Sequence, residues 1–195
     1  MRIRALIFLA VGGMVVGGCG SDDEGNSASV ERQEETLDKL PDLPRGYEQF
    51  LNRDGGIVFG RPPGWTAKTR GATSTLTAPD GLVSSTITID RTDDALRGAP
   101  EDFAVQTAEL LPGYEEPLDA GEPEEFEHLY DAAIAEAEGT ARKTGVRQGV
   151  SVIVLEREGA AVVTAVIADN AEEDTGAEVK QALEAISTLR TRPPL

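Results

Sequence analysis

A single histidine is the first candidate for acid–base chemistry in this chain. His128 lies among carboxylates, and Asp131 follows three residues later. The pair could form a general base held by a carboxylate, or a metal ligand with acidic neighbours. The sequence has no second histidine, no HExxH pattern and no GxSxG elbow. We therefore expect a solvent-facing His128 in an acidic loop and no bound metal, with a hydrolase built on His128 and Asp131 as an alternative.

The lone cysteine, Cys19, is the second reactive residue. It follows two arginines and an apolar run of about a dozen residues, which suits a signal peptide and is too short to span a bilayer. The motif Val16-Gly17-Gly18-Cys19 resembles the lipobox of bacterial lipoproteins, although Gly17 replaces the more common Ala, Ser or Thr. The resemblance implies cleavage between Gly18 and Cys19 and fatty acyl chains such as palmitate on the sulfur. An ordinary secretory signal or an uncleaved anchor would leave Cys19 unmodified.

Carboxylates gather between residues 98 and 141. From Arg97 to Arg142 the chain has no other lysine or arginine, and Glu101 through Glu138 supply 13 carboxylates. This region predicts either a solubilising surface with a mobile loop over 111–127, or a docking face for a cationic partner or a loosely held divalent cation. No EF-hand spacing supports a calcium site. The residues that we assign to a possible partner surface are Glu115, Glu116, Glu122, Glu124 and Glu125.

The only tryptophan follows a forced turn. Pro63-Gly64 directly precedes Trp65, and a Pro-Gly pair is typical of a tight turn. Trp65 is interpreted either as a core residue that braces this turn or as the cap of a groove for a small apolar or lipid ligand.

Net charge limits the partners. The 195 residues include 35 acidic and 18 basic ones, a formal charge of −17, and removal of Arg2 and Arg4 with a signal peptide leaves 16 basic residues and a charge of −19. Such a chain excludes nucleic acid as a partner, because that binding rests on lysine and arginine. Anionic headgroups would repel it, so acyl chains on Cys19 must hold it at the extracytoplasmic face of the cell membrane. We expect no cofactor.

Composition divides the chain into three parts. Residues 1–18 form the signal peptide, and residues 19–45, with eight acidic and three basic residues among 20–45, form a flexible acidic tether. Residues 46–195 are long enough for one globular domain.

The elements of this domain follow from turn signals and periodicity. We expect a helical turn at 47–51, a strand at 57–59, hairpins at 73–90 and 149–168, and a strand at 130–140. Helices are expected at 100–111, with Phe103, Thr107 and Leu110 on one side, and at 176–190, ended by Pro193-Pro194. The prediction is an α+β fold, with an antiparallel sheet of about six strands and helices packed on it.

Phe59, Pro63-Gly64-Trp65 and this order of elements together resemble the PsbP-like α/β/α sandwich. Over residues 55–191 the chain is similar, more narrowly, to actinobacterial lipoproteins of the LpqN type. The resemblance implies a non-catalytic accessory or binding module of the cell envelope, which engages a protein or another envelope component. The family offers no catalytic residues to carry over, and a shared fold does not establish function.

Overall fold

The computed structural model describes residues 43–91, 99–128, 130–157 and 161–191. These ranges contain ten strands and two helices, joined by loops and turns. Within these ranges no helix is long and apolar enough to cross a membrane. In chain order the elements are β1 (Glu48–Asn52), β2 (Ile57–Arg61), β3 (Thr66–Arg70), β4 (Thr73–Thr77), β5 (Val83–Asp90), α2 (Pro100–Leu110), β6 (Glu124–Glu125), β7 (Asp131–Thr140), β8 (Arg147–Arg157), β9 (Ala161–Asn170), α3 (Gly176–Ser187) and β10 (Arg190–Thr191).

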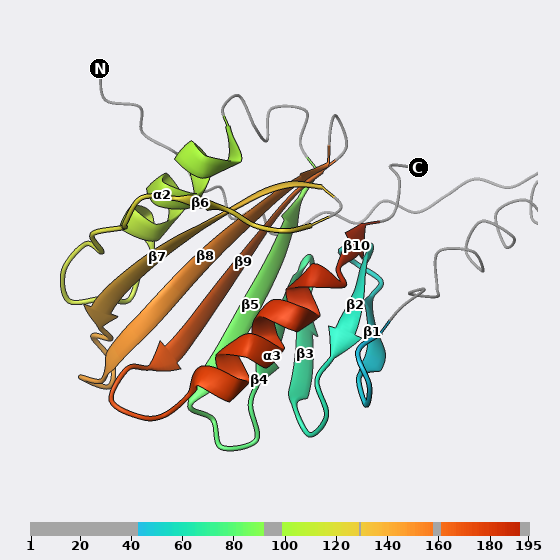
Figure 1. Ribbon diagram of the computed structural model, residues 1–195, viewed down its shortest axis with the longest axis horizontal. Helices are drawn as coiled ribbons and strands as arrows, with labels where there is room; N and C mark the ends of the chain where they lie inside the picture. Colours follow the sequence, from blue (N-terminus) through green and yellow to red (C-terminus); the bar gives the residue numbers. More distant parts are fainter. Residues whose placement is uncertain (1–42, 92–98, 129, 158–160, 192–195) are drawn as a thin grey trace, which may run out of the picture.

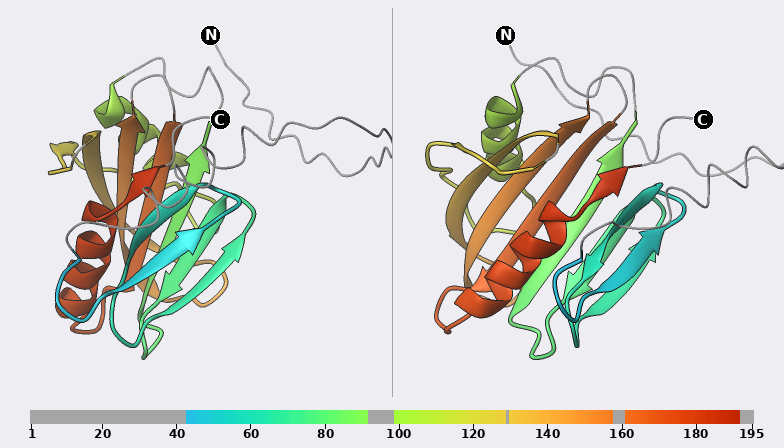
Figure 2. Two further views of the ribbon diagram at one scale, coloured as in Figure 1. Left: turned by 90° about the vertical axis from the view of Figure 1, so that its right-hand side faces the viewer. Right: turned by 45° about the vertical axis from the view of Figure 1, so that its right-hand side comes forward.

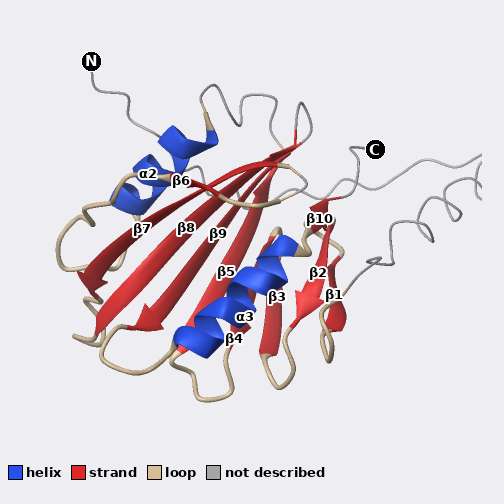
Figure 3. Ribbon diagram, in the orientation of Figure 1, coloured by secondary structure: helices blue, strands red, loops and turns tan. Residues whose placement is uncertain are grey.

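The strands form two antiparallel sheets (Figure 1). The larger sheet has the order β3-β4-β5-β9-β8-β7-β6, and the smaller has the order β1-β2-β10. Figure 3 shows that helices are a minor part of this arrangement. The α+β class predicted from the sequence is confirmed.

Side chains of β8 alternate between two cores, because successive residues of a strand point to opposite faces. Ile153 and Leu155 share a core with Ala182, Ala185 and Ile186 of α3. On the other face, Val152 packs with Ala108 of α2, and Val154 packs with Ala104. The large sheet therefore carries α3 on one face and α2 on the other, as expected for the sandwich.

The small sheet lies on the same face of the large sheet as α3. Ile57 and Phe59 of β2 belong to the same core as Leu76 of β4 and the residues of α3. Both views of Figure 2 place β1 and β2 beside the β3–β4 end of the large sheet. The Gly60 backbone N–H donates to Thr188 Oγ1 at 2.7 Å, which ties β2 to the end of α3.

The two predicted hairpins are present. Strands β4 and β5 pair antiparallel around a turn in which Gly81 has a φ of +79°, a conformation that glycine adopts without steric cost. Strands β8 and β9 pair from Arg157↔Ala161 to Gln148↔Asn170. Strand β7, predicted from a period-two alternation of alanine and charged residues, is also confirmed.

Several local predictions are wrong. Residues 48–52 form strand β1 and not a helical turn. They pair antiparallel with β2, where Phe50 lies opposite Phe59. Strand β3 was not predicted, and it pairs with β4 through a run of polar residues that lacks an apolar pattern. The short strands β6 and β10 were also missed, so the count of about six strands is too low.

Both helices differ in detail from expectation. The buried residues of α2 are Ala104 and Ala108, with Phe103 partly buried beside them. Leu110 is 77% exposed, so the expected face of Phe103, Thr107 and Leu110 is only partly the packing face. Small residues let the helix lie close to the sheet. Helix α3 ends at Ser187, before the predicted Arg190, because the chain turns there to pair with β2 as β10.

Candidate functional site

The acidic residues assigned to a partner surface lie on one segment that follows the edge of the large sheet. This edge segment, residues 114–125, runs beside β7. Tyr114 forms a bridge with Ala141, Glu115 N–H donates to the Thr140 carbonyl at 3.0 Å, and Gly121 N–H donates to the Glu136 carbonyl at 2.9 Å. Strand β6 then pairs with β7 at Ala133 and Ile134. The expected mobile loop is therefore hydrogen-bonded along the strand.

Two side chains fix the edge segment to the core. Leu118 is 4% exposed and packs with Ala108 of α2 and Val150 and Val152 of β8. The Tyr114 hydroxyl donates to Gln148 Oε1 at 3.2 Å. Burial, and to a lesser extent the charge of Asp169, raises the pKa of Tyr114, so the phenol stays protonated and keeps this bond.

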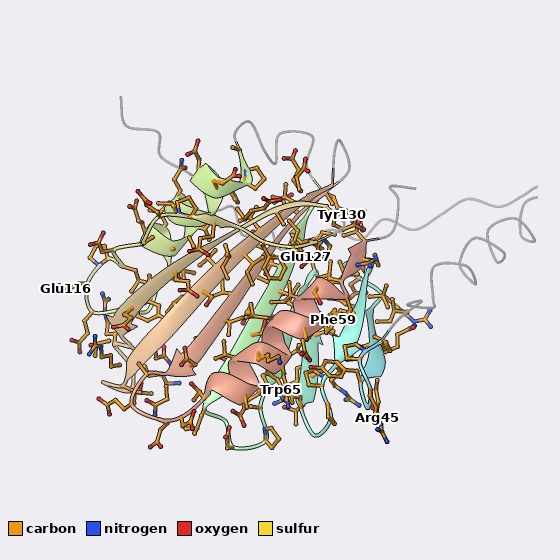
Figure 4. All side chains as sticks on the ribbon, in the orientation of Figure 1. Arg45, Phe59, Trp65, Glu116, Glu127 and Tyr130 are labelled. Atoms are coloured by element: carbon orange, nitrogen blue, oxygen red, sulfur yellow. The ribbon has the colours of Figure 1, made fainter. Side chains whose placement is uncertain are left out.

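The five glutamates point into solvent. Glu115, Glu116, Glu122, Glu124 and Glu125 are all exposed. They do not form one cluster, because Glu115 lies beside the end of β7 at Thr140 whereas Glu125 lies opposite Ala133 near its start. Figure 4 shows Glu116 at the outer margin of the sheet. The arrangement is a row of carboxylates along an edge, which suits contact with an extended cationic surface and not coordination of one ion.

At the β6 end of this row lies a cleft of about 700 Å³. It lies between the start of α2 and the stretch that leads from β6 into β7. Its charged groups are the carboxylates of Glu101, Glu125, Glu127 and Asp131. All four belong to the acidic region predicted as a possible docking face, but only Glu125 is among the five residues assigned to the partner surface. That Glu101 meets the others was missed, because nothing local shows that the start of α2 lies beside the β6–β7 connection.

Three aromatic rings line the same cleft. Phe126 and His128 stack with centroids 6.5 Å apart, and His128 and Tyr130 lie 4.9 Å apart at a tilt of 53°. The Thr191 N–H donates to the Tyr130 hydroxyl at 3.1 Å, which ties the rings to β10. Figure 4 shows Tyr130 near the end of α3. The spacing of two between these residues was a signal in the sequence that their side chains lie together.

His128 does not have the environment predicted for it. It is partly buried, and its Nδ1 accepts a hydrogen bond from the Tyr130 backbone N–H at 3.0 Å. Burial, and next the Arg190 guanidinium, lowers the pKa of His128 to about 4, against an opposing effect of the Leu189 and Ile186 carbonyls. The ring is therefore neutral at neutral pH. The expectation of a solvent-facing residue is wrong.

The alternative of a hydrolase is not favoured by this geometry. Nδ1 of His128 accepts from Tyr130, so it does not donate to Asp131 as the orienting bond of a catalytic pair requires. A pKa of about 4 also makes the imidazole a poor general base near neutral pH. No group of three or more metal-ligating side chains occurs among the described residues. Cys19 lies outside them.

Trp65 is a core residue. It is 3% exposed, and its indole Nε1–H donates to Gln181 Oε1 of α3 at 2.9 Å. The Trp65 N–H closes the preceding turn by donating to the Pro62 carbonyl at 3.3 Å. Trp65 braces the turn against α3, and the interpretation that placed it at the mouth of a ligand groove is wrong. It lies apart from the acidic row (Figure 4).

Comparison with known proteins relates the chain by fold. No protein family model matches it, and no curated protein matches its sequence. The Ran-binding protein Mog1p of Saccharomyces cerevisiae is 13% identical, with 74% of this chain and 95% of Mog1p covered and a TM-score of 0.53. LpqN of Mycobacterium tuberculosis, which is involved in cell envelope biogenesis, is 18% identical, with coverages of 75% and 91% and a TM-score of 0.50.

A third solved structure, from Bacteroides thetaiotaomicron, is 13% identical with a TM-score of 0.52. The match covers 75% of this chain but only 49% of that protein, so this chain corresponds to about half of it. At these identities the likeness shows the fold alone. The PsbP-like and LpqN-like fold expected from the element order is confirmed at that level.

Proposed function

We propose that this protein is a lipid-anchored, extracytoplasmic binding module without catalytic activity, which engages a cationic protein partner through its edge segment. Residues 1–18 are the signal peptide, Cys19 carries the acyl chains, residues 19–45 are the tether, and residues 46–195 form the binding domain. This organisation places the row of carboxylates at the end of a tether above the membrane.

The observation that carries the proposal is the exposed row of carboxylates on a rigid support. Leu118 and the backbone bonds to β7 hold the edge segment in place, so its glutamates are presented at little cost in conformational entropy. A single-sign row of this kind attracts an oppositely charged partner over about 10 Å at moderate salt. Mog1p, a Ran-binding protein of the same fold, is a precedent for a binding role.

Location is tested by mass analysis of the N-terminal peptide from membranes of a bacterial host. We expect a peptide that begins at Cys19 and carries acyl chains. The Cys19→Ser protein should be lost from the membrane fraction or should keep its signal peptide. A chain that begins at Met1 with an unmodified thiol would refute the anchor and leave the binding role to be tested separately.

Binding is tested with a variant in which Glu115, Glu116, Glu122, Glu124 and Glu125 are all changed to glutamine. The matched control removes five exposed charges elsewhere, through Asp54→Asn, Asp80→Asn, Glu172→Gln, Glu173→Gln and Asp174→Asn. Both variants should keep the far-UV circular dichroism of the wild type, because the changed side chains are exposed.

Chemical crosslinking on envelope membranes, followed by quantitative mass spectrometry, compares the three proteins. We expect the amount of basic protein crosslinked to the edge variant to be at least about fivefold lower than the amount crosslinked to the wild type or the control. Each exposed ion pair contributes little, so the effect requires that several glutamates contact the partner at once. Equal crosslinking by the edge variant and the wild type would exclude the edge segment as the docking surface.

A further inference from the structure

The connection between β6 and β7, of which residues 126–128 and 130 are described, lies over the end of α3. Phe126 N–H donates to the Ala132 carbonyl at 3.0 Å, which holds the connection between β6 and β7 as a narrow hairpin. Phe126 and Tyr130 pack against the core that includes α3 and Leu189. The Thr191 N–H donates to the Tyr130 hydroxyl, so the hairpin is also tied to β10.

His128 lies at the centre of this closure, between the two aromatic rings. Its Nδ1 accepts the Tyr130 N–H, so the proton of the neutral ring is on Nε2. Nε2 is buried and makes no hydrogen bond of good geometry to the described residues, although the carbonyls of Leu189 and Ile186 are close enough to raise the pKa of the ring. A proton taken up from solvent would bind at Nδ1, and the bond from the Tyr130 N–H would then break, since a protonated nitrogen cannot accept.

The charged groups around His128 come from three elements. Glu125, Glu127 and Asp131 of its own stretch are exposed, and Glu101 of α2 lies across the cleft from them. From the end of α3 and β10 come the carbonyls of Ile186 and Leu189 and the guanidinium of Arg190. The positive charge of Arg190 is the charge that acts on the ring, and it opposes a second positive charge there.

We propose that the described residues of the β6–β7 connection, 124–128 and 130–132, form an acid-released latch, in which protonation of His128 frees Phe126 and Tyr130 from α3 and β10 and widens the cleft. Release would uncover the apolar surface that these two rings now cover. The inference does not depend on the proposed function, because it concerns a local opening of the fold.

The direction of the pH effect follows from linkage. His128 has a pKa of about 4 in the closed hairpin, against 6.5 for an unperturbed histidine. The open state therefore binds more protons between these values, and opening is favoured as the pH falls through 6.5 towards 4. With the full difference between the two pKa values of His128, the opening constant would be about 30-fold larger at about pH 5 than at neutral pH. The closed ring is partly exposed, which reduces the expected increase to about tenfold.

Hydrogen–deuterium exchange of the mature protein between about pH 7.5 and pH 5 measures this opening, because most carboxylates stay ionised in that range. After correction for the intrinsic exchange rate, peptides from 124–132 should show an opening constant about tenfold higher at the lower pH. Peptides from β8 serve as the internal control and should change less than about twofold.

Two variants identify the group responsible. In His128→Asn the amide oxygen can still accept the Tyr130 N–H, as in an Asx turn, but it does not titrate, so the pH response should vanish. Arg190→Gln removes the opposing charge and should reduce the response while His128 remains. The proposal is overturned if the opening constant of the wild type does not change with pH, or if its pH response is undiminished in His128→Asn. If His128→Asn also loses protection in β8, the Arg190→Gln variant decides: a pH response as large as that of the wild type would overturn the proposal.

Discussion

Trp65 and His128 differ in how far their neighbours could be inferred from the sequence. Trp65 follows a Pro-Gly turn in an apolar context, which predicted a core brace as one of two roles, and the structure encloses it against Gln181 of α3. His128 has acidic neighbours in sequence, and in space the rings of Phe126 and Tyr130 and the charge of Arg190 act on it as well. Its solvent exposure was predicted from the wrong set of neighbours, because Arg190 is distant along the chain.

At the residue scale, Trp65→Phe tests the brace. The substitution removes the indole N–H that bonds Gln181 Oε1 and leaves a small void in the core. We expect the free energy of unfolding to fall by about 1–3 kcal/mol, measured by urea denaturation and far-UV circular dichroism.

A double-mutant cycle with Gln181→Leu separates the hydrogen bond from the packing of the Trp65 ring. If the bond matters, Trp65→Phe should cost about 1 kcal/mol less in the Gln181→Leu background than in the wild type. Strict additivity of the two changes would show that the bond contributes no coupling energy.

At the scale of elements, the sequence predicted the strands that carry a regular apolar pattern or a turn signal. It failed where tertiary contacts decide the structure. Strand β3 is polar along most of its length and exists because β4 offers it a partner. The buried residues of α2 are two alanines. The periodicity of the large apolar residues in this helix therefore did not indicate them.

Gly139→Ala tests how the edge segment is attached. A methyl group at Gly139 would lie 2.3 Å from Leu118 Cδ2 and 3.0 Å from Tyr114 Cδ1, so both anchors of the segment must move. We expect a loss of about 1–2 kcal/mol in the free energy of unfolding, and faster hydrogen exchange over residues 114–121.

Gly121→Ala is the matched control for this experiment. A Cβ at Gly121 would have its nearest neighbour, the Glu136 carbonyl, at 3.6 Å, which is an ordinary contact. The control should change the stability by less than about 0.5 kcal/mol. Equal effects of the two substitutions would contradict the attachment through Leu118 and Tyr114.

At the scale of the whole molecule, the order of elements and the α+β class were predictable, and the order of strands was not. Strand β5 pairs with β9 over eight residue pairs, from Val83↔Asp169 to Asp90↔Val162. No local signal indicates that pairing, because hairpins define only neighbours in sequence. The cleft was not predicted for the same reason, since its two walls come from α2 and the β6–β7 connection.

The net charge predicts a salt-dependent stability. The sequence has 35 acidic and 18 basic residues, and repulsion among the carboxylates opposes the compact state. Raising the salt from about 10 mM to about 200 mM shortens the screening length, so we expect the melting temperature at neutral pH to rise by about 3 °C. Differential scanning calorimetry measures this.

The variant with five edge glutamates changed to glutamine should show a smaller rise than the wild type. The control with five charges removed elsewhere should show a similar reduction, because long-range repulsion depends on the total charge and not on the edge alone. A melting temperature that falls with added salt would show instead that favourable ion pairs dominate.

The pairing of β10 with β2 also constrains when the domain can become complete. Arg190↔Val58 and Thr191↔Ile57 join residues that are more than 130 positions apart in the chain. During synthesis the first strands are made early, but the small sheet lacks its third strand until the last helix has left the ribosome. The nascent polypeptide therefore stays unfinished until then, a state in which it can still be threaded through a narrow channel.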